Sequence, residues 1–247
     1  MTNETPKKSV KVVEYRVGKK GYQDVATYDA VRYEGPANEY KQTVMANAYT
    51  RLIGSLEGKR VLDVGCGTGR GVASFAREAA FAAGSDASLD MLTFAARKSE
   101  GNTRCGFVNA YAQQLPFRDA SFDVVTTLNF LHLFDLGTQR DMIAEMKRVV
   151  RPGGILVLEF DNALHGGIVG LYKRWFSDER GSFPHEIRRV IGDSCRVVKV
   201  YGAVFPIIWR LLFRIPGVSI PLEKIAYLPP FNRLSHRIYY KLEKLSA

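Results

Sequence analysis

The segment that most constrains the fold of this chain is residues 61–71, Val-Leu-Asp-Val-Gly-Cys-Gly-Thr-Gly-Arg-Gly. A short apolar run enters a glycine-rich turn, and such a turn lets backbone approach a ligand closely because glycine tolerates positive φ and has no Cβ. The turn is not the dinucleotide-binding fingerprint G-x-G-x-x-G, because Arg70 stands where the third glycine counted from Gly65 would be. It is not a P-loop either, because no Gly-Lys-Ser/Thr follows. Asp63 would repel a pyrophosphate and suits a ligand with an ammonium group.

Around this turn, short apolar runs alternate with helix-like segments from residue 59 to residue 160, which is typical of a parallel α/β sheet. The runs are almost continuously apolar, as expected for strands buried on both faces. We predict strands over residues 60–64, 81–85, 103–108, 122–128 and 155–160. We predict helices over residues 88–100 and 138–150, and a turn at Pro152-Gly153-Gly154.

The flanking regions differ from this core. Residues 21–55 are helical and aromatic in pattern, and residues 194–204 and 237–242 predict two further strands. Residues 205–236 are apolar and basic, contain several prolines and are too many for an ordinary loop. We interpret them as a cap or docking element, with burial as added core as the alternative.

We expect a flexible basic tail over residues 1–20 and a single domain over residues 21–247. Within that domain, residues 58–160 form the cofactor-binding core and residues 161–236 contain substrate or cap elements.

Charge is concentrated at the two ends of the chain. The 247 residues carry a formal net charge of +10, with six basic and two acidic side chains in residues 1–20 and nine and two in residues 196–247. Basic ends suit anionic lipid, an anionic substrate or RNA, or they are solvated tails that aid solubility. Three cysteines without a CxxC pair argue against a disulfide framework and favour a reducing cytoplasm.

Several short motifs give the chain a family resemblance. Asp63-Val64-Gly65-Cys66-Gly67-Thr68-Gly69 comes first, and Asp86 ends the second strand 21 positions after Gly65. The segments that follow are Asn109-Ala110-Tyr111-Ala112-Gln113-Gln114-Leu115-Pro116-Phe117, Ser121-Phe122-Asp123-Val124-Val125 leading to Leu131-His132, and Val150-Arg151-Pro152-Gly153-Gly154. In this order and spacing they resemble the class I S-adenosylmethionine-dependent methyltransferases, in particular the type 11, UbiE-like small-molecule group.

The resemblance implies a Rossmann-like, doubly wound, mostly parallel seven-stranded sheet, with a helical N-terminal segment and a cap insertion before the last strand. It also implies S-adenosyl-L-methionine as cofactor, bound at the turn of Gly65, Gly67 and Gly69. By position, Asp63 would contact the methionine end, Asp86 the ribose and Asn109 the adenine amino group. The remaining cofactor contacts implied are a backbone donor at Ala110, a backbone carbonyl at Leu128, and Tyr28 in an aromatic segment that folds over the cofactor. Plain helix packing is the alternative for Tyr28. Asn109 replaces the family's usual Asp, and its amide oxygen can still accept a hydrogen bond.

Methyl transfer needs proximity more than elaborate functional groups, and a general base is useful only when the acceptor loses a proton. His132, just past the fourth strand, is the best-placed catalytic candidate, with a packing role as the alternative. No His/Asp/Glu cluster has metal-ligand spacing, so we expect no metal.

The function expected is methylation of a small, hydrophobic acceptor such as a lipid, a quinone precursor or a secondary metabolite. The alternatives are an RNA methyltransferase, for which no RNA-binding module is evident, and a non-catalytic cofactor-binding protein. We expect a cytoplasmic protein, or one peripheral to a membrane through residues 205–236, because no stretch offers an uninterrupted apolar span. The sequence does not indicate an oligomeric state.

Overall fold

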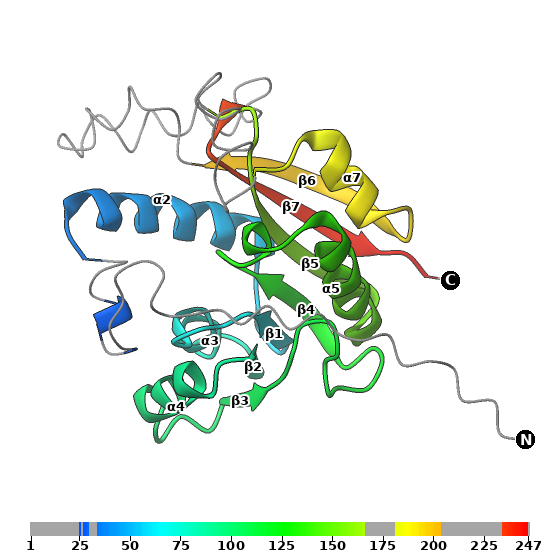
Figure 1. The fold of residues 1–247 in the computed structure, drawn as a ribbon. Coiled ribbons are helices and arrows are strands. Elements are labelled where there is room, and N and C mark those ends of the chain that lie inside the picture. The colour runs from blue at the N-terminus through cyan, green and yellow to red at the C-terminus, as the bar shows by residue number, and fades with distance from the viewer. Residues whose placement is uncertain (1–24, 26, 30–33, 166–180, 204–233, 247) are drawn as a thin grey trace, which may run out of the picture.

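The protein forms one seven-stranded sheet with helices on both faces (Figure 1). This computed structural model describes residues 25, 27–29, 34–165, 181–203 and 234–246. The strands are β1 (Arg60–Val64), β2 (Phe81–Asp86), β3 (Cys105–Asn109), β4 (Phe122–Thr127), β5 (Val150–Asp161), β6 (Cys195–Ala203) and β7 (Arg237–Lys244). Their order is β3-β2-β1-β4-β5-β7-β6, with β1 to β5 parallel and β7 antiparallel to both of its neighbours. This confirms the predicted mostly parallel sheet.

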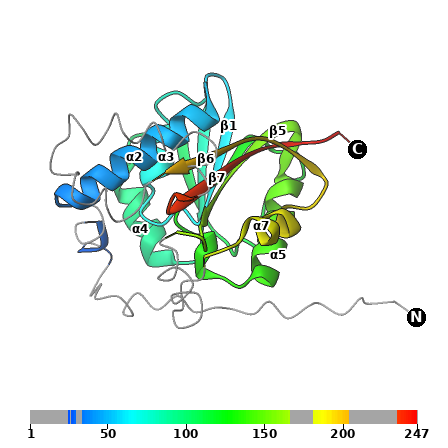
Figure 2. The ribbon, with the colours of Figure 1, turned by 90° about the horizontal axis from the view of Figure 1, so that it is seen from above.

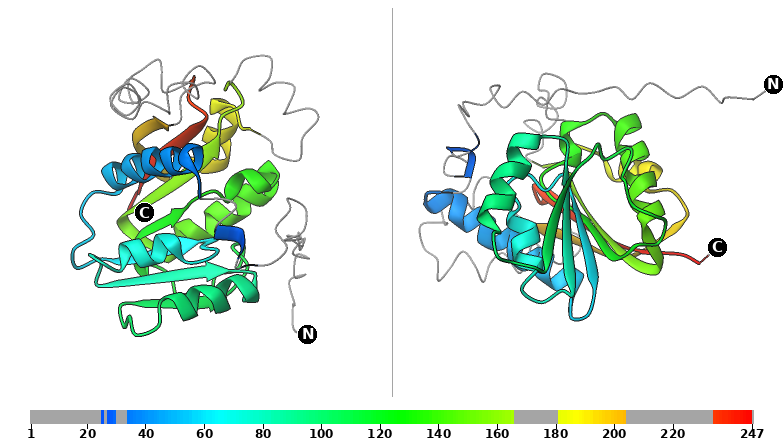
Figure 3. Two further views of the ribbon diagram at one scale, coloured as in Figure 1. Left: turned by 90° about the vertical axis from the view of Figure 1, so that its left-hand side faces the viewer. Right: turned by 90° about the horizontal axis from the view of Figure 1, so that it is seen from below.

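Two layers of helices cover the sheet. The helices are α2 (Pro36–Ile53), α3 (Arg70–Phe75), α4 (Leu89–Lys98), η2 (Leu131–Leu133), α5 (Leu136–Val149) and α7 (Pro184–Ile191). Seen from above and from below, α2, α3 and α4 lie to one side of the strands and α5 and α7 to the other (Figures 2 and 3). Each layer has its own core: Leu52 and Phe75 pack on one face, and Met142 and Ile187 on the other.

Local signals explain where several elements begin. Ser88 caps α4 by accepting a hydrogen bond from the amide of Met91, as its position before the helix predicts. Asp135 caps α5 by accepting from the amides of Gly137 and Thr138, so this helix starts two residues earlier than predicted. Apolar residues dominate the central strands: Val61, Leu62 and Val64 of β1 are fully buried.

The structure corrects two expectations. Pro152-Gly153-Gly154 is not a turn before a strand, because β5 begins at Val150 and runs through it. The pairing of β4 with β5 shifts register between Phe122 and Val124, which accommodates the irregular backbone of β5 at Pro152-Gly153-Gly154. Helix α7 was not predicted; its eight residues are too few for a strong period, although Pro184 at its start fits a first helical position.

The order of the strands places a switch point at β1. The chain moves outward from β1 to β2 and β3, then returns to the other side of β1 as β4. In open α/β sheets, ligands bind outside the carboxyl ends of strands at such a point, because connections leave it in opposite directions. The glycine turn that follows β1 lies there.

Some expectations fall outside the described residues. These are the basic tail, residues 1–20, and nearly all of the proposed cap, of which only residues 234–236 are described. Within the described ranges, no helix combines the length and apolar character needed to cross a bilayer.

Candidate functional site

The glycine turn owes its shape to three residues with left-handed backbone. Gly65, Gly67 and Gly69 have φ of 72°, 52° and 75°. The amides of Gly65 and Cys66 donate to the carbonyl of Ser85, at 2.8 and 3.0 Å, which ties the turn to β2. A Cβ on Gly65 would collide with the Phe130 ring, whereas a Cβ on Gly67 would meet nothing within 4 Å. The backbone at Gly67 therefore faces open space.

Asp86, at the end of β2, organises this loop. Its Oδ2 accepts from the amide of Gly67 at 2.9 Å, and its Oδ1 accepts from the amide of Ser88 at 2.9 Å. Burial raises the pKa of Asp86, while these amide hydrogen bonds lower it in part. Each carboxylate oxygen can accept more than one hydrogen bond, so Asp86 keeps acceptor capacity for a ligand.

Asn109 stands beside Asp86 because the two residues are register partners on β2 and β3. Its Nδ2 donates to the Asp86 carbonyl at 3.0 Å, which directs the amide oxygen away from that carbonyl. The amide of Ala110 also donates to the Asp86 carbonyl, at 3.0 Å. The donor that the sequence assigns to Ala110 is thus already engaged, which corrects that expectation.

Asp63 is the most perturbed carboxyl group of the loop. It is 3% exposed, and its Oδ1 accepts from the hydroxyl of Thr126 at 3.0 Å across the β1–β4 pair. Burial raises the pKa of Asp63 to about 7, although the Thr126 hydrogen bond opposes this shift. A buried carboxyl group with this pKa can lose its proton when a ligand binds and then pair, as a carboxylate, with a cationic group of that ligand.

The N-terminal segment contacts the loop from outside. Asp29 accepts from the Thr68 hydroxyl and from Lys98 Nζ, both at 2.7 Å. The Asp29–Thr68 hydrogen bond brings the segment that contains the half-buried Tyr28 close to the glycine turn. A cavity of about 410 Å³ borders the turn at Thr68 and Gly69 and also touches Leu128. Sequence reasoning did not single out Asp29, because a lone carboxylate in a helical segment carries no pattern.

His132 lies in η2 within a buried charged cluster. Its Nδ1 is 3.3 Å from Arg237 Nη1 and 3.8 Å from Asp161 Oδ1, and its side chain is 4% exposed. Arg237 also pairs with Asp161 and, at 2.9 Å, with Glu159. An arginine can only donate, so this contact makes Nδ1 an acceptor and leaves the ring hydrogen on Nε2. In this tautomer Nε2 carries the hydrogen and can only donate, whereas a general base requires a nitrogen that can accept a proton.

The other candidate groups have structural surroundings. Burial raises the pKa of the Cys66 thiol far above its usual range, which suits a packing residue and not a nucleophile. His165 and His236 pack their rings against each other, with centroids 4.5 Å apart. In the described ranges, no three His, Cys, Asp or Glu side chains are grouped as ligands of one metal ion would be.

Comparison with known proteins adds to this geometry. Residues 61–154 match a family described as a methyltransferase domain. Over 114 residues the chain is 40% identical to a demethylmenaquinone methyltransferase of Clavibacter sepedonicus, and this match covers 46% of each protein. Over 110 residues it is 40% identical to a fatty-acid O-methyltransferase of Mycolicibacterium smegmatis, covering 42% of this chain and 38% of that one. The chain thus spans about half the length, or less, of these curated relatives.

Solved structures share the fold over most of the chain. Magnesium protoporphyrin IX methyltransferase from Synechocystis, with bound SAH, matches with a TM-score of 0.64 and 18% identity, covering 89% of this chain and 93% of that one. The [4+2]-cyclase SpnF matches with a TM-score of 0.61 and 21% identity, covering 82% and 80%. At these identities the likeness shows the fold alone.

Proposed function

We propose that this chain, whose residues 61–154 match a family described as a methyltransferase domain, is an S-adenosylmethionine-dependent methyltransferase acting on a small, apolar acceptor. One observation carries the proposal. The glycine turn holds open backbone beside three side-chain acceptors, Asp63, Asp86 and Asn109, at the carboxyl ends of the adjacent strands β1, β2 and β3.

These residues fit the three parts of the cofactor. Asp63 is a buried carboxyl group that an ammonium would convert to its charged form. Asp86 has acceptor capacity for ribose hydroxyls, and the Asn109 amide oxygen, oriented by its own hydrogen bond, can accept from an adenine amino group. When bound, S-adenosylmethionine supplies a methyl group already activated on a sulfonium.

The remaining task of the protein is to position the acceptor and to exclude water. The Phe130 ring packs against Gly65 and lies edge-on to Phe134, with centroids 4.9 Å apart. These rings give the site an apolar wall beside the turn. We assign His132 a packing role beside the site, because its side chain is buried and its Nδ1 contacts Arg237.

The acceptor class rests on the relatives. The matched regions belong to proteins named for methylation of a quinone precursor and of fatty acids, both apolar small molecules. The [4+2]-cyclase shares this fold but is named for a different reaction. Because one fold can host different reactions, methyl transfer by this chain has to be tested directly.

Calorimetry with S-adenosylhomocysteine tests the cofactor site. Asp86→Ala should weaken binding by about 1.5–3 kcal/mol, because it removes an ionised acceptor, and Asp86→Asn should lose less. Asp90→Ala is the matched control, since Asp90 is an exposed carboxylate in the first turn of α4. Equal affinity for the wild type and both Asp86 variants would refute the ribose assignment.

A second experiment identifies the acceptor. The protein is incubated with methyl-labelled cofactor and, separately, with extracts of lipids, small polar metabolites and RNA. Label in the lipid fraction is the expected result, and label in RNA alone would overturn the proposed class. Tight cofactor binding with no labelled product from any extract would favour a non-catalytic cofactor-binding protein.

A further inference from the structure

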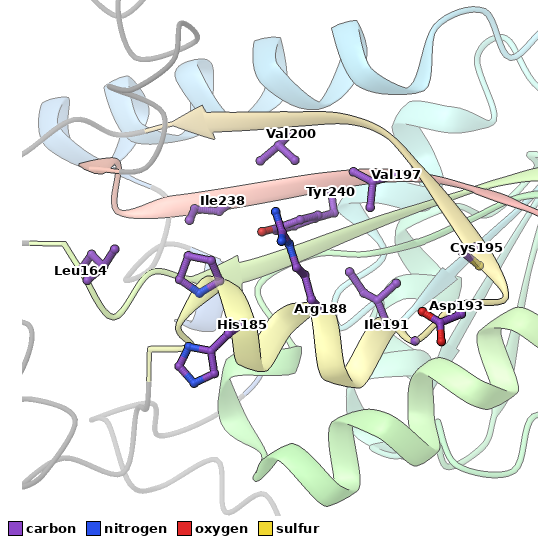
Figure 4. A pocket seen from close by; sticks show the side chains of 12 residues that line it. Leu164, His185, Arg188, Ile191, Asp193, Cys195, Val197, Val200, Ile238 and Tyr240 are labelled. Atoms are coloured by element: carbon purple, nitrogen blue, oxygen red, sulfur yellow. The ribbon is translucent and has the colours of Figure 1, made fainter.

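A second cavity of about 920 Å³ lies between α7 and the strands β6 and β7 (Figure 4). It is on the α5 and α7 face of the sheet, because Ile191, Ile238 and Tyr240 in its lining belong to the core of that face. The cavity beside the glycine turn is bordered by residues of α2 and α3, on the opposite face. The two spaces are therefore separate, and the second lies in the size range of small-molecule sites, about 300–1,000 Å³.

The walls of this cavity are largely apolar. Ile191 comes from α7, Val200 from β6 and Ile238 from β7, so the lining joins a helix face to two strands (Figure 4). At the rim, Leu164 and Val197 are 40% and 45% exposed, which is high for large apolar side chains. A bound apolar group would cover both side chains.

One cation reaches into this apolar space. Arg188 rises from α7 toward Tyr240 and the strands (Figure 4). Among the described residues its guanidinium forms no ion pair or hydrogen bond, in contrast to the guanidinium groups of Arg148, Arg196 and Arg237, which all pair with carboxylates. His185 lies one turn earlier on the same helix and lines the same cavity, whereas Asp193 stands past the helix end, away from His185.

We propose that this cavity binds a long-chain monocarboxylate, with the carboxylate on the Arg188 guanidinium and the alkyl chain along Val200, Ile238 and Ile191. A guanidinium matches a carboxylate with two parallel hydrogen bonds. The eight residues of α7 span about 12 Å, enough to flank a substantial part of an alkyl chain. The site does not depend on methyl transfer, since it lies on the other face from the glycine turn.

Titration of the full chain with dodecanoate, followed by calorimetry, tests the site. We expect saturable binding of one molecule per chain, and Arg188→Gln should weaken it about tenfold. Arg189→Gln is the matched control, because Arg189 is the next residue of α7 and does not line the cavity; it should bind like the wild type. Methyl dodecanoate lacks the charge and should bind the wild type and Arg188→Gln alike.

A second variant separates this site from the cofactor site. Val200→Trp would fill the cavity and should abolish dodecanoate binding, while S-adenosylhomocysteine affinity and the circular dichroism spectrum stay those of the wild type. Saturating S-adenosylhomocysteine should leave dodecanoate affinity unchanged. Competition between the two ligands, equal binding by Arg188→Gln and Arg189→Gln, or no saturable binding by the folded wild type would each overturn the proposal.

Discussion

At the scale of single residues, Asp63 links the proposed function to pH. Its pKa of about 7 reflects burial first, with the nearby Asp86 adding to the shift and Thr126 opposing it. Below that pH the carboxyl group is protonated, and a ligand ammonium must displace the proton. We therefore expect S-adenosylhomocysteine affinity at pH 6 to be about tenfold lower than at pH 8.

Calorimetry in buffers of different ionisation enthalpy measures both the affinity and the released proton. Asp63→Asn should bind weakly and lose this pH dependence, and an unaltered pH profile in that variant would contradict the assignment.

The raised pKa of Asp63 also means that the folded state holds a proton that the unfolded chain releases. Through this group alone, the unfolding free energy of the free protein falls as pH rises from about 4 to 7.

Alanine substitutions at Gly67 and Gly153 can distinguish the cost of backbone strain from the loss of a ligand contact. Gly67 and Gly153 have φ of 52° and 69°, and a Cβ at either position would meet nothing within 4 Å. Alanine at either should cost about 1–2 kcal/mol of stability, the usual penalty for left-handed backbone. Only Gly67→Ala should also weaken S-adenosylhomocysteine binding, because only its Cβ would enter the proposed cofactor space. Urea denaturation and calorimetry on both variants check this, and equal affinity would contradict it.

At the scale of elements, Arg148 of α5 holds the segment that follows β3. Its guanidinium donates to the carbonyls of Leu115 and Phe117 and pairs with Glu145 and Asp119. Glu145 in turn accepts from the amide of Leu115 at 3.0 Å. Arg148 thus holds the segment that follows Asn109 and β3 against α5.

Arg148→Met should reduce the unfolding free energy by about 2–3 kcal/mol, because several charge-assisted hydrogen bonds are lost together. Arg140→Met is the control, since Arg140 is an exposed residue of the same helix and should change stability by about 0.5 kcal/mol or less. Denaturation in urea measures both. Similar values for the two variants would show that the clamp contributes little.

At the scale of the whole molecule, Arg237 of β7 contacts residues of both β5 and η2. Burial raises the pKa of Asp161, but the Arg237 guanidinium beside it holds that pKa below its usual range. Glu159 is only 2% exposed, and burial raises its pKa despite the same arginine. Arg237 is therefore the main charge partner of both carboxylates.

Arg237→Met should destabilise the protein by about 3–5 kcal/mol, the cost of leaving buried charges unpaired. Arg196→Met breaks an exposed pair with Glu243 on the neighbouring strand and should cost about 1 kcal/mol or less. The loss in Arg237→Met should be smaller at pH 5 than at pH 8, because Asp161 and Glu159 can then take up protons. Urea unfolding at both pH values tests this, and a loss independent of pH would contradict it.

The sequence by itself determined the order of the strands along the chain, the glycine turn and the carboxylates near the carboxyl ends of β1 and β2. These features are local: burial on both faces produces continuous apolar runs, and a left-handed turn requires glycine. The family resemblance of their motifs assigned Asp63, Asp86 and Asn109 to the cofactor, and the three lie together because parallel strands bring their carboxyl ends to one edge of the sheet.

Only the tertiary structure decided the features that join distant parts of the chain. Asp29 contacts Thr68 across 39 positions, Arg237 reaches His132 across 105, and the amide of Ala110 is taken by Asp86. No local pattern records such pairs, since they follow from strand order and from which face each side chain occupies. The α7 cavity has the same origin: its lining comes from a helix and two strands, and the space exists only once β7 has inserted between β5 and β6.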